Sequence, residues 1–451
     1  MAETIAKQDG HDAMSFRQCF ERARNDTPQP PWLARLREAG LSSFEQQGFP
    51  TLKDEDWRFT NVAPIANLPF QPALGLPDGD GISGRVAQIP FTLLDGPRLV
   101  FVNGHFSREH STLHNSPPGV RIENLAAALA ADSSLLEKHL GQYAHLDGNS
   151  FAALNQAMFA DGAFLRVPAG VDVVKPIEFI FVSSARHPGE TCHPRNLVIA
   201  EAGSRVTIVE SYVGAHDTRY FTNAVTELVV GDSATVELLK FQDETPNAFH
   251  VATIQGKFGR ASNVTVHSFA LGARLSRNNI RAHLAGEGLE CVLNGLYLTK
   301  GEQLADHHMV VEHAQPRCAS HEYFNGILDD SSKGVFHGRI LVRPIAQKTD
   351  AKQTNKNLLL SDDATADTKP QLEIYADDVK CTHGATIGQL NDESIFYLRS
   401  RGLSVETAKR MLIHAFAGEI IARIHSEPVR EELDQVLWDR LEANPHIAEK
   451  Q

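Results

Sequence analysis

A cysteine and a histidine two positions apart, Cys381 and His383, are the residues of this chain whose types and spacing best suit chemistry. They follow Gln371 to Tyr375, where polar and apolar residues alternate with the period of a half-buried β-strand. If the chain stays extended, both side chains point to one face, with their backbones roughly 7 Å apart. A thiolate and an imidazole on one face suit a soft or borderline metal ion. Two ligands do not complete a metal site, so the others must come from elsewhere.

Other interpretations of this segment stay open. Cys381 is either a thiol kept reactive by the neighbouring imidazole or a buried cysteine beside a hydrogen-bonded histidine. Asp377 and Asp378 suggest a carboxylate pair for acid–base catalysis, as in β-solenoid enzymes that act on polysaccharides. Adjacent residues of a strand face opposite sides, however, so a turn or edge role is favoured for both aspartates.

A histidine-rich stretch provides a second candidate for metal binding. Its spacing matches no closed four-ligand zinc pattern, so we interpret these residues as surface or turn positions. The histidine-rich stretch contains Asp306, His307, His308, His313, Cys318 and His321.

Cys291 lies outside this stretch, between Leu289 and Leu293 in an alternating segment, and is interpreted as a core cysteine.

The composition is ordinary for a globular chain. Of its 451 residues, 42% are hydrophobic and 22% are charged. The N-terminus lacks the apolar core of a secretory signal, and no apolar run approaches the roughly 20 residues of a membrane span, so we expect a cytoplasmic protein. The net charge of −13 argues against non-specific binding to nucleic acid or to anionic membranes.

Several common functional motifs do not occur. The five cysteines (Cys19, Cys192, Cys291, Cys318 and Cys381) contain no C-x-x-C, which argues against a disulfide framework or a zinc knuckle. The sequence contains no P-loop, no dinucleotide-binding glycine motif after a strand and no G-x-S-x-G elbow. We therefore expect no nucleotide hydrolysis, dinucleotide chemistry or serine hydrolysis by this chain alone.

From about residue 162 to residue 398, short β-branched segments recur between turns of small residues. Glycines recur at nearly constant intervals, at positions 170, 203, 231, 259 and 286, and an alternating strand follows each turn from 203 on. Repeats of this length with strands and no helices predict a stacked β-solenoid, and a β-sandwich with Greek-key links is the alternative. The open ends of a solenoid expose strand edges, which flanking segments or a partner must cover.

Helical patterns flank the strand-rich region. Residues 14 to about 48 read as helices, the first over Met14–Arg24 and the second opening at Pro31 and closing on Gly40. Residues 70 to 95 read as loop, and helix returns at Ile122 to His139. After Ser404, a plausible N-cap, an apolar stripe includes Ala408, Met411, Leu412 and Phe416, and a second helix follows near Val429 to Leu441. The predicted division is a helical and mixed domain at 1–160, a β-solenoid at 161–400 and a helical domain at 401–451.

Together these motifs resemble the SufB/SufD family of iron–sulfur cluster assembly proteins. The segment from Asp367 to Gly388 closely resembles the family signature, and the similarity includes Gly334–Ile340, Ala346–Leu360 and Phe396–Gly402. Near the N-terminus, Lys53–Thr60 is similar to the K-x-E-x-W-[KR]-[YF]-T segment of SufD-type members. The chain lacks the N-terminal cysteine cluster of SufB-type members, which favours the SufD type.

The resemblance implies a mainly β fold: a right-handed parallel β-helix between an N-terminal helical or mixed domain and a C-terminal helical domain. It implies pairing with SufB through the β-helix and binding of the ATPase SufC through the C-terminal helices, in a complex of one SufB, two SufC and one SufD-type chain. His383 corresponds to a histidine thought to act with a SufB cysteine in cluster assembly, and Cys381 lies in the same interface. In the C-terminal helices, Met411, Leu412 and Phe416 are expected to contact SufC.

On this interpretation the chain is a non-enzymatic scaffold subunit. His383, with Cys381, supplies half of a metal site and a partner chain supplies the rest, so a nascent cluster forms at the interface and no cofactor resides in the isolated chain. Two alternatives stay open: a SufB-like scaffold that pairs with a second copy of itself, and a carbohydrate-active β-helix enzyme that uses Asp377 and Asp378.

Overall fold

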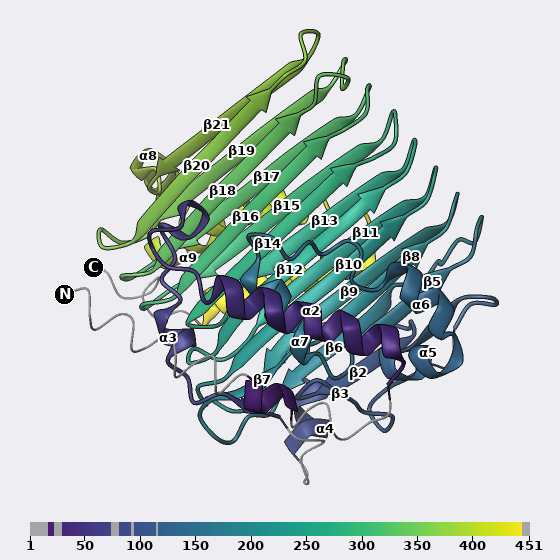
Figure 1. Cartoon of the computed structure of the whole chain (residues 1–451). Coiled ribbons are helices and arrows are strands. Elements are labelled where there is room, and N and C mark those ends of the chain that lie inside the picture. The colour runs from purple at the N-terminus through teal and green to yellow at the C-terminus, as the bar shows by residue number, and fades with distance from the viewer. Residues whose placement is uncertain (1–16, 22–28, 74–80, 92–93, 114–115, 444–451) are drawn as a thin grey trace.

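Two parallel β-sheets stacked face to face form the body of the protein (Figure 1). The computed structural model describes residues 17–21, 29–73, 81–91, 94–113 and 116–443, so most of the helix expected at 14–24 lies outside the described residues. From β8 on, successive strands alternate between an 11-stranded sheet A and a 10-stranded sheet B, as each coil of a solenoid requires. None of the described helices is long and apolar enough to cross a membrane.

Each coil contributes one strand to each sheet. Sheet A contains β1 (Gln71–Pro72), β4 (Arg121–Asn124), β5 (Ala163–Val167), β7 (Glu190–Cys192), β8 (Arg195–Ala200), β10 (Phe221–Val230), β12 (Phe249–Phe258), β14 (Leu275–Leu284), β16 (Leu304–His313), β18 (Lys333–Val342) and β20 (Thr365–Ile374). Sheet B contains β2 (Arg98–Val102), β3 (His105–Phe106), β6 (Ile177–Ser183), β9 (Arg205–Gly214), β11 (Thr235–Asp243), β13 (Asn263–Ala270), β15 (Glu290–Thr299), β17 (Ala319–Leu328), β19 (Asp350–Leu359) and β21 (Lys380–Gly388).

The register of sheet A shows that successive coils are of similar length. Phe221 pairs with Phe249, which pairs with Leu275, and the row continues through Leu304, Lys333 and Thr365. The intervals along this row agree with the glycine spacing in the sequence, because a turn must recur once per coil at the same corner. The β-solenoid prediction is confirmed, and the β-sandwich alternative is wrong.

The space between the sheets is filled by alternate residues of every strand. Apolar side chains such as Ile208, Leu238 and Ile254 fill one side of this interior. Cys291 lies there with no exposed surface, which confirms it as a core cysteine. On the other side the interior strand positions carry polar side chains, including Glu210, Lys240 and His307, all of them buried.

Helices of the N-terminal part cover the outer face of sheet A (Figure 1). The helix α2 (Pro31–Gln47) packs along α7 (Ser150–Met158). The sequence predicted that the first of these helices ends at Gly40, but it continues because a Cβ at residue 40 would lie 2.8 Å from the backbone nitrogen of Ala157. Gly40 therefore permits close helix packing and does not end the helix.

The remaining N-terminal elements are short. Strand β4 occupies the start of the stretch predicted as one helix at 122–139, and two helices follow it, while 70–95 contains short elements where only loop was expected. These elements are η1 (Glu55–Trp57), α3 (Ala63–Ala66), α4 (Gly81–Val86), α5 (Leu125–Ala131) and α6 (Ser133–His139).

Two of the C-terminal helices, α9 (Val405–Ile421) and α10 (Glu427–Glu442), lie against the outer face of sheet B, behind the solenoid in Figure 1, and α8 (Asp392–Ser400) contacts α9. Ser404 caps α9 by accepting the amide of Thr407. Ile413 and Ile420 of α9 and Leu437 of α10 pack against strand residues of sheet B. The three-domain division of the sequence stays a prediction.

Candidate functional site

The two ends of the solenoid differ. At the N-terminal end, β4 pairs antiparallel with β5, and β3 pairs antiparallel with β2, so each sheet ends there on a short antiparallel strand, of four and two residues respectively. At the C-terminal end, β20 and β21 are the last strands, and no strand of the described residues pairs with their outer edges. Figure 1 shows β20 and β21 as the last strands of the two sheets. An open edge of this length requires a partner or a protective feature.

The backbone groups at the open end can be assigned from the ladder. The amide of Lys380 donates to Thr349, which precedes β19, so the even-numbered residues of β21 turn their backbone groups inward. Backbone directions alternate along a strand. Cys381, His383, Ala385 and Ile387 therefore present their N–H and C=O groups to the open edge.

Proline occupies the corresponding edge of sheet A. The amide of Thr365 donates to Ser332, so odd residues of β20 face the neighbouring strand and even residues face outward. Pro370 is an outward residue and lacks an N–H, which is tolerated only on an edge strand. The open edge of sheet A therefore offers an added strand one backbone N–H donor fewer than an edge without proline would.

The side chains of Cys381 and His383 lie on the interior face of β21. Cys381 pairs with Ala351 and packs against the interior cluster at this end, and His383 pairs with Gln353. Since no further coil covers them, Cys381 is half-buried and His383 is exposed. Burial, with a smaller contribution from Asp350, raises the pKa of the Cys381 thiol, so the thiol form is favoured.

The two residues do not complete a metal site within the described part of the chain. The single grouping there of three His, Cys, Asp or Glu side chains with closely spaced ligand atoms lies elsewhere. Asp377 and Asp378 form the exposed turn before β21, where the backbone carbonyl of Asp378 accepts from the amide of Lys348 and its side chain pairs with the amine of the same residue.

Most of the histidine-rich stretch is buried, contrary to the surface or turn positions predicted for it, and His321 is half-buried. His307 and His313 have no exposed surface and His308 is 3% exposed, because coils stack on both sides of β16. His307 faces the interior, where Ser268 lies 3.0 Å from its Nε2. His308 faces outward. In the part of the chain that the structure describes, no zinc site forms among Asp306, His307, His308, His313, Cys318 and His321.

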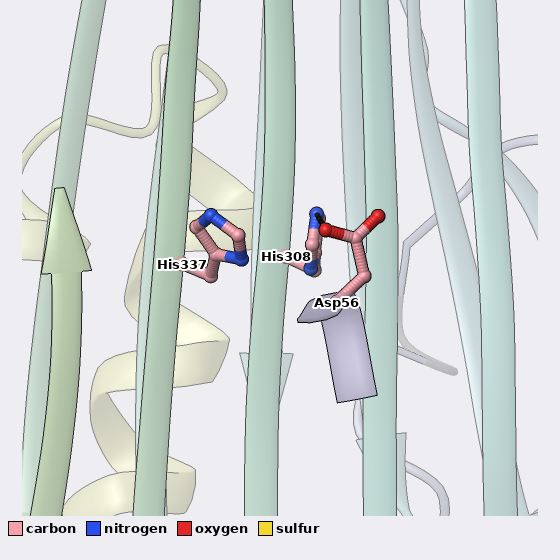
Figure 2. Close-up of side chains that lie close together, drawn as sticks. All are labelled: Asp56, His308 and His337. Carbon is pink, nitrogen blue, oxygen red and sulfur yellow. Dashed lines mark ion pairs between the residues drawn. The ribbon is translucent and has the colours of Figure 1, made fainter. Parts of the chain in front are cut away.

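His308 instead belongs to a cluster that the sequence analysis missed. Figure 2 shows His308 between His337 of the next coil and Asp56 of η1, and their ligand atoms lie within 4.8 Å of one another. Both rings are buried, and burial lowers the pKa of each histidine, so both are neutral. His308 and His337 are separated by the length of one coil, and this spacing is the sequence signal that could have predicted their contact.

Hydrogen bonding in the cluster disfavours a metal ion. Arg277 Nη2 lies 3.0 Å from His308 Nδ1, and a guanidinium can only donate, so the ring proton of His308 sits on Nε2. That nitrogen is the one facing Asp56, at 3.8 Å from Oδ1. Metal-bound histidines donate from their other nitrogen, which Arg277 prevents here.

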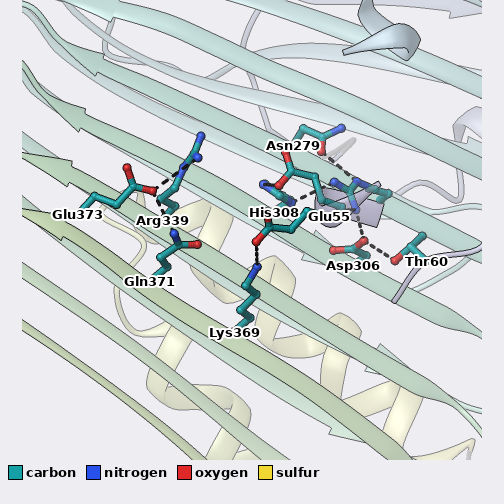
Figure 3. Close-up of polar contacts among 11 residues, drawn as sticks. Glu55, Thr60, Asn279, Asp306, His308, Arg339, Lys369, Gln371 and Glu373 are labelled. Carbon is teal, nitrogen blue, oxygen red and sulfur yellow. Dashed lines mark hydrogen bonds and ion pairs between the residues drawn. The ribbon is translucent and has the colours of Figure 1, made fainter. Parts of the chain in front are cut away.

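The surrounding contacts fasten the N-terminal segment to sheet A (Figure 3). Thr60 donates to Asp306 at 2.5 Å, and Lys369 of β20 donates to Glu55 at 2.6 Å. The guanidinium carbon of Arg277 lies 3.7 Å from the ring centre of Trp57, a cation–π contact. The segment similar to the SufD-type K-x-E-x-W motif therefore holds three coils together.

The C-terminal residues expected to bind a partner differ in exposure. Met411 is 41% exposed, Leu412 is half-buried, and Phe416 packs partly against sheet B while its carbonyl accepts from Asn325. Two aromatic residues of α8 are more accessible: Phe396 is 73% exposed and Tyr397 is 56% exposed.

Fold and site define a two-sheet β-solenoid that is capped at one end and open at the other, with a cysteine and a histidine beside the open edges. The sequence matches the profile "SUF system FeS cluster assembly, SufBD core domain" over residues 181–416 and "SufBD protein N-terminal region" over residues 13–179. The chain belongs to the SufBD family of iron–sulfur cluster assembly proteins.

Curated relatives match along most of their length. An iron–sulfur cluster assembly SufBD family protein of Synechocystis is 35% identical over 402 residues, 87% of each chain. The iron–sulfur cluster assembly protein SufD of Escherichia coli is 31% identical over 403 residues, 89% of this chain and 91% of its own. SufD of Bacillus subtilis is 26% identical over 420 residues, 91% of this chain and 94% of its own.

Proposed function

We propose that this chain is the SufD-type scaffold subunit of a SufBCD-type complex. A SufB-type chain adds strands to β20 and β21, and the iron–sulfur cluster is assembled where the two chains meet. The observation that carries this proposal is the difference between the ends of the solenoid: one end finishes in short antiparallel strands, and the other presents the full-length edges of β20 and β21 beside His383. The complex would be cytoplasmic and contain one SufB, two SufC and one copy of this chain.

Within this proposal His383 is the more effective ligand. Its imidazole is exposed at the edge, whereas the Cys381 thiol is half-buried and its pKa is raised by burial. Iron and sulfide are cargo held between chains, with partner ligands completing the site, so this chain needs no resident cofactor. Catalysis of ATP hydrolysis belongs to the SufC-type partner, since this sequence has no P-loop.

The C-terminal helices supply the surface for the ATPase. Phe396 and Tyr397 of α8 and Met411 of α9 are large side chains left exposed on neighbouring helices. Large exposed apolar groups of this kind mark protein interaction sites. Leu412 stays in the proposed surface at its margin, and Phe416 supports it from below by packing on sheet B.

Co-expression with SufB-type and SufC-type partners tests the proposal. His383→Ala should leave the complex assembled, because the side chain takes no part in strand pairing, and should lower the rate of cluster assembly by at least about tenfold, the usual cost of losing a metal-site residue. Cys381→Ser should reduce it less. Normal cluster assembly by an intact His383→Ala complex would refute the role of His383.

Pairing with a second copy of this chain is the alternative when no SufB-type partner is present. The same two open edges could join in a two-fold arrangement, because antiparallel addition of β21 to its own copy is self-complementary. Mass measurement of the chain alone shows whether it pairs with a second copy. Mass measurement after addition of a SufB-type partner shows whether the partner replaces that copy.

A further inference from the structure

One interior row of sheet B leads from a buried acid to His383. The register places Glu322 of β17 beside Gln353 of β19, and Gln353 beside His383 of β21. The residue before Glu322 in this row is Leu293, so the row changes from apolar to polar toward the open end. Glu322 has no exposed surface and Gln353 is 1% exposed.

The side chain of Gln353 contacts the neighbouring coil and the opposite sheet. Its Nε2 donates to Glu322 Oε2 at 2.7 Å, on the β17 side. Gly338 of the opposite sheet makes room for it, since a Cβ there would lie 2.1 Å from the same Nε2. Burial raises the pKa of Glu322 to about 8, so this partner is a neutral carboxylic acid at pH 7.

The other end of the amide has no partner. Gln353 Oε1 is buried and accepts no hydrogen bond from any described residue. The amide nitrogen faces β17, and β17 and β21 flank β19 on opposite sides, so we infer that the oxygen faces the β21 side. The next side chain of the row on that side is the imidazole of His383. A buried amide oxygen without a donor is costly, and a ring N–H would satisfy it.

We propose that Gln353 is a positioning residue for His383: when the exposed imidazole turns toward the interior, Gln353 Oε1 accepts its ring N–H and fixes the tautomer whose other nitrogen carries the free lone pair. Glu322 in turn holds the amide of Gln353 so that its oxygen faces His383. Histidines that bind metals are commonly fixed in this way by an acceptor on the second nitrogen. The relevance to cluster assembly depends on the proposed function of His383, but the hydrogen bond itself does not.

The test is the tautomer of His383 in the full-length chain without partners, measured from imidazole ¹⁵N chemical shifts at a pH where the ring is neutral. The His383 signals are identified by their loss in His383→Gln. Wild type should show one tautomer. Gln353→Met, which keeps the shape but removes the acceptor, should give a mixture of both, whereas Gln353→Glu, which retains an acceptor, should restore one tautomer. Gln371→Met on β20 is the matched control and should behave as wild type.

An unchanged tautomer in Gln353→Met would overturn the proposal. If that variant does not fold, Glu322→Leu removes the group that orients the amide and should also give mixed tautomers. Cluster assembly with the partner chains is measured in parallel and should fall about tenfold in Gln353→Met. A tautomer that responds while neither Gln353→Met nor His383→Ala slows assembly would leave Gln353 as a positioning residue and refute the proposed function of His383.

Discussion

Glu322 is a carboxyl group that folding removes from water without pairing it with a cation. Its folded pKa of about 8 lies above its ordinary value near 4.5. The folded chain therefore keeps a proton that the unfolded chain releases between these two pH values, so stability decreases as the pH rises through this window. Glu322→Gln should remove this loss.

The variant should be more stable than wild type by on the order of 2 kcal/mol at pH 7, with the difference vanishing near pH 4. Urea unfolding at several pH values measures this, with Glu290→Gln on the exposed start of β15 as the control. A difference that does not change with pH would show that Glu322 is ionised in the folded chain.

At the residue scale, the sequence shows which side chains can do chemistry but not which ones meet. The placement of Cys381 and His383 on one face followed from the alternation of a single strand. Gln353 and Glu322 could not be connected, because they lie on successive coils and their contact depends on the register of β17 and β19. Asp56 was missed for a similar reason, since it reaches His308 only after η1 folds onto sheet A.

At the scale of elements, Glu237 of β11 fastens the C-terminal helices to sheet B. Burial alone would raise its pKa, but donors around it hold the pKa at about 2. They are His267 Nε2 at 3.1 Å, the backbone amide and ring of His425 at 2.7 and 3.1 Å, and the amide of Ser426, the N-cap of α10, at 3.3 Å. The carboxylate thus also lies at the positive end of α10.

Because its folded pKa is depressed, Glu237 contributes stability above pH 4.5 that is lost as the pH falls toward 2. Glu237→Gln should cost about 2–4 kcal/mol at pH 7 and progressively less below pH 4. Hydrogen exchange should become faster in α9 and α10 and stay unchanged in β12 to β18. Glu431→Gln, at an exposed position of α10, serves as the control, and equal effects of both variants would contradict the anchoring role.

Helices were predicted unevenly for physical reasons. The C-terminal helices have one apolar face, so their periodicity was visible. The helix α7 was not identified because all of its residues are buried, which removes the contrast between faces. The end of α2 was predicted too early, because Gly40 resembles a C-cap in sequence. In the structure, the missing side chain of Gly40 allows α2 to pack against α7.

At the scale of the whole molecule, the repeating coil could be predicted because each corner requires its own small-residue turn. The pairing of two strands per coil, one in each sheet, and the capped and open ends required the structure. We propose above that the open end joins a partner through β21. Ala385 is the residue through which this can be tested, because its backbone N–H points to the open edge and away from β19.

The most direct measurement is the affinity of the full-length chain for a SufB-type partner, with Ala385→Pro compared against Ala385→Val. Proline removes the outward N–H and places its ring against an added strand, while the valine variant keeps the donor. Both variants should fold as wild type does, and Ala385→Val should pair normally. Ala385→Pro should weaken pairing by at least about tenfold, the equivalent of one lost backbone hydrogen bond. Equal affinities for the proline and valine variants would contradict pairing through β21.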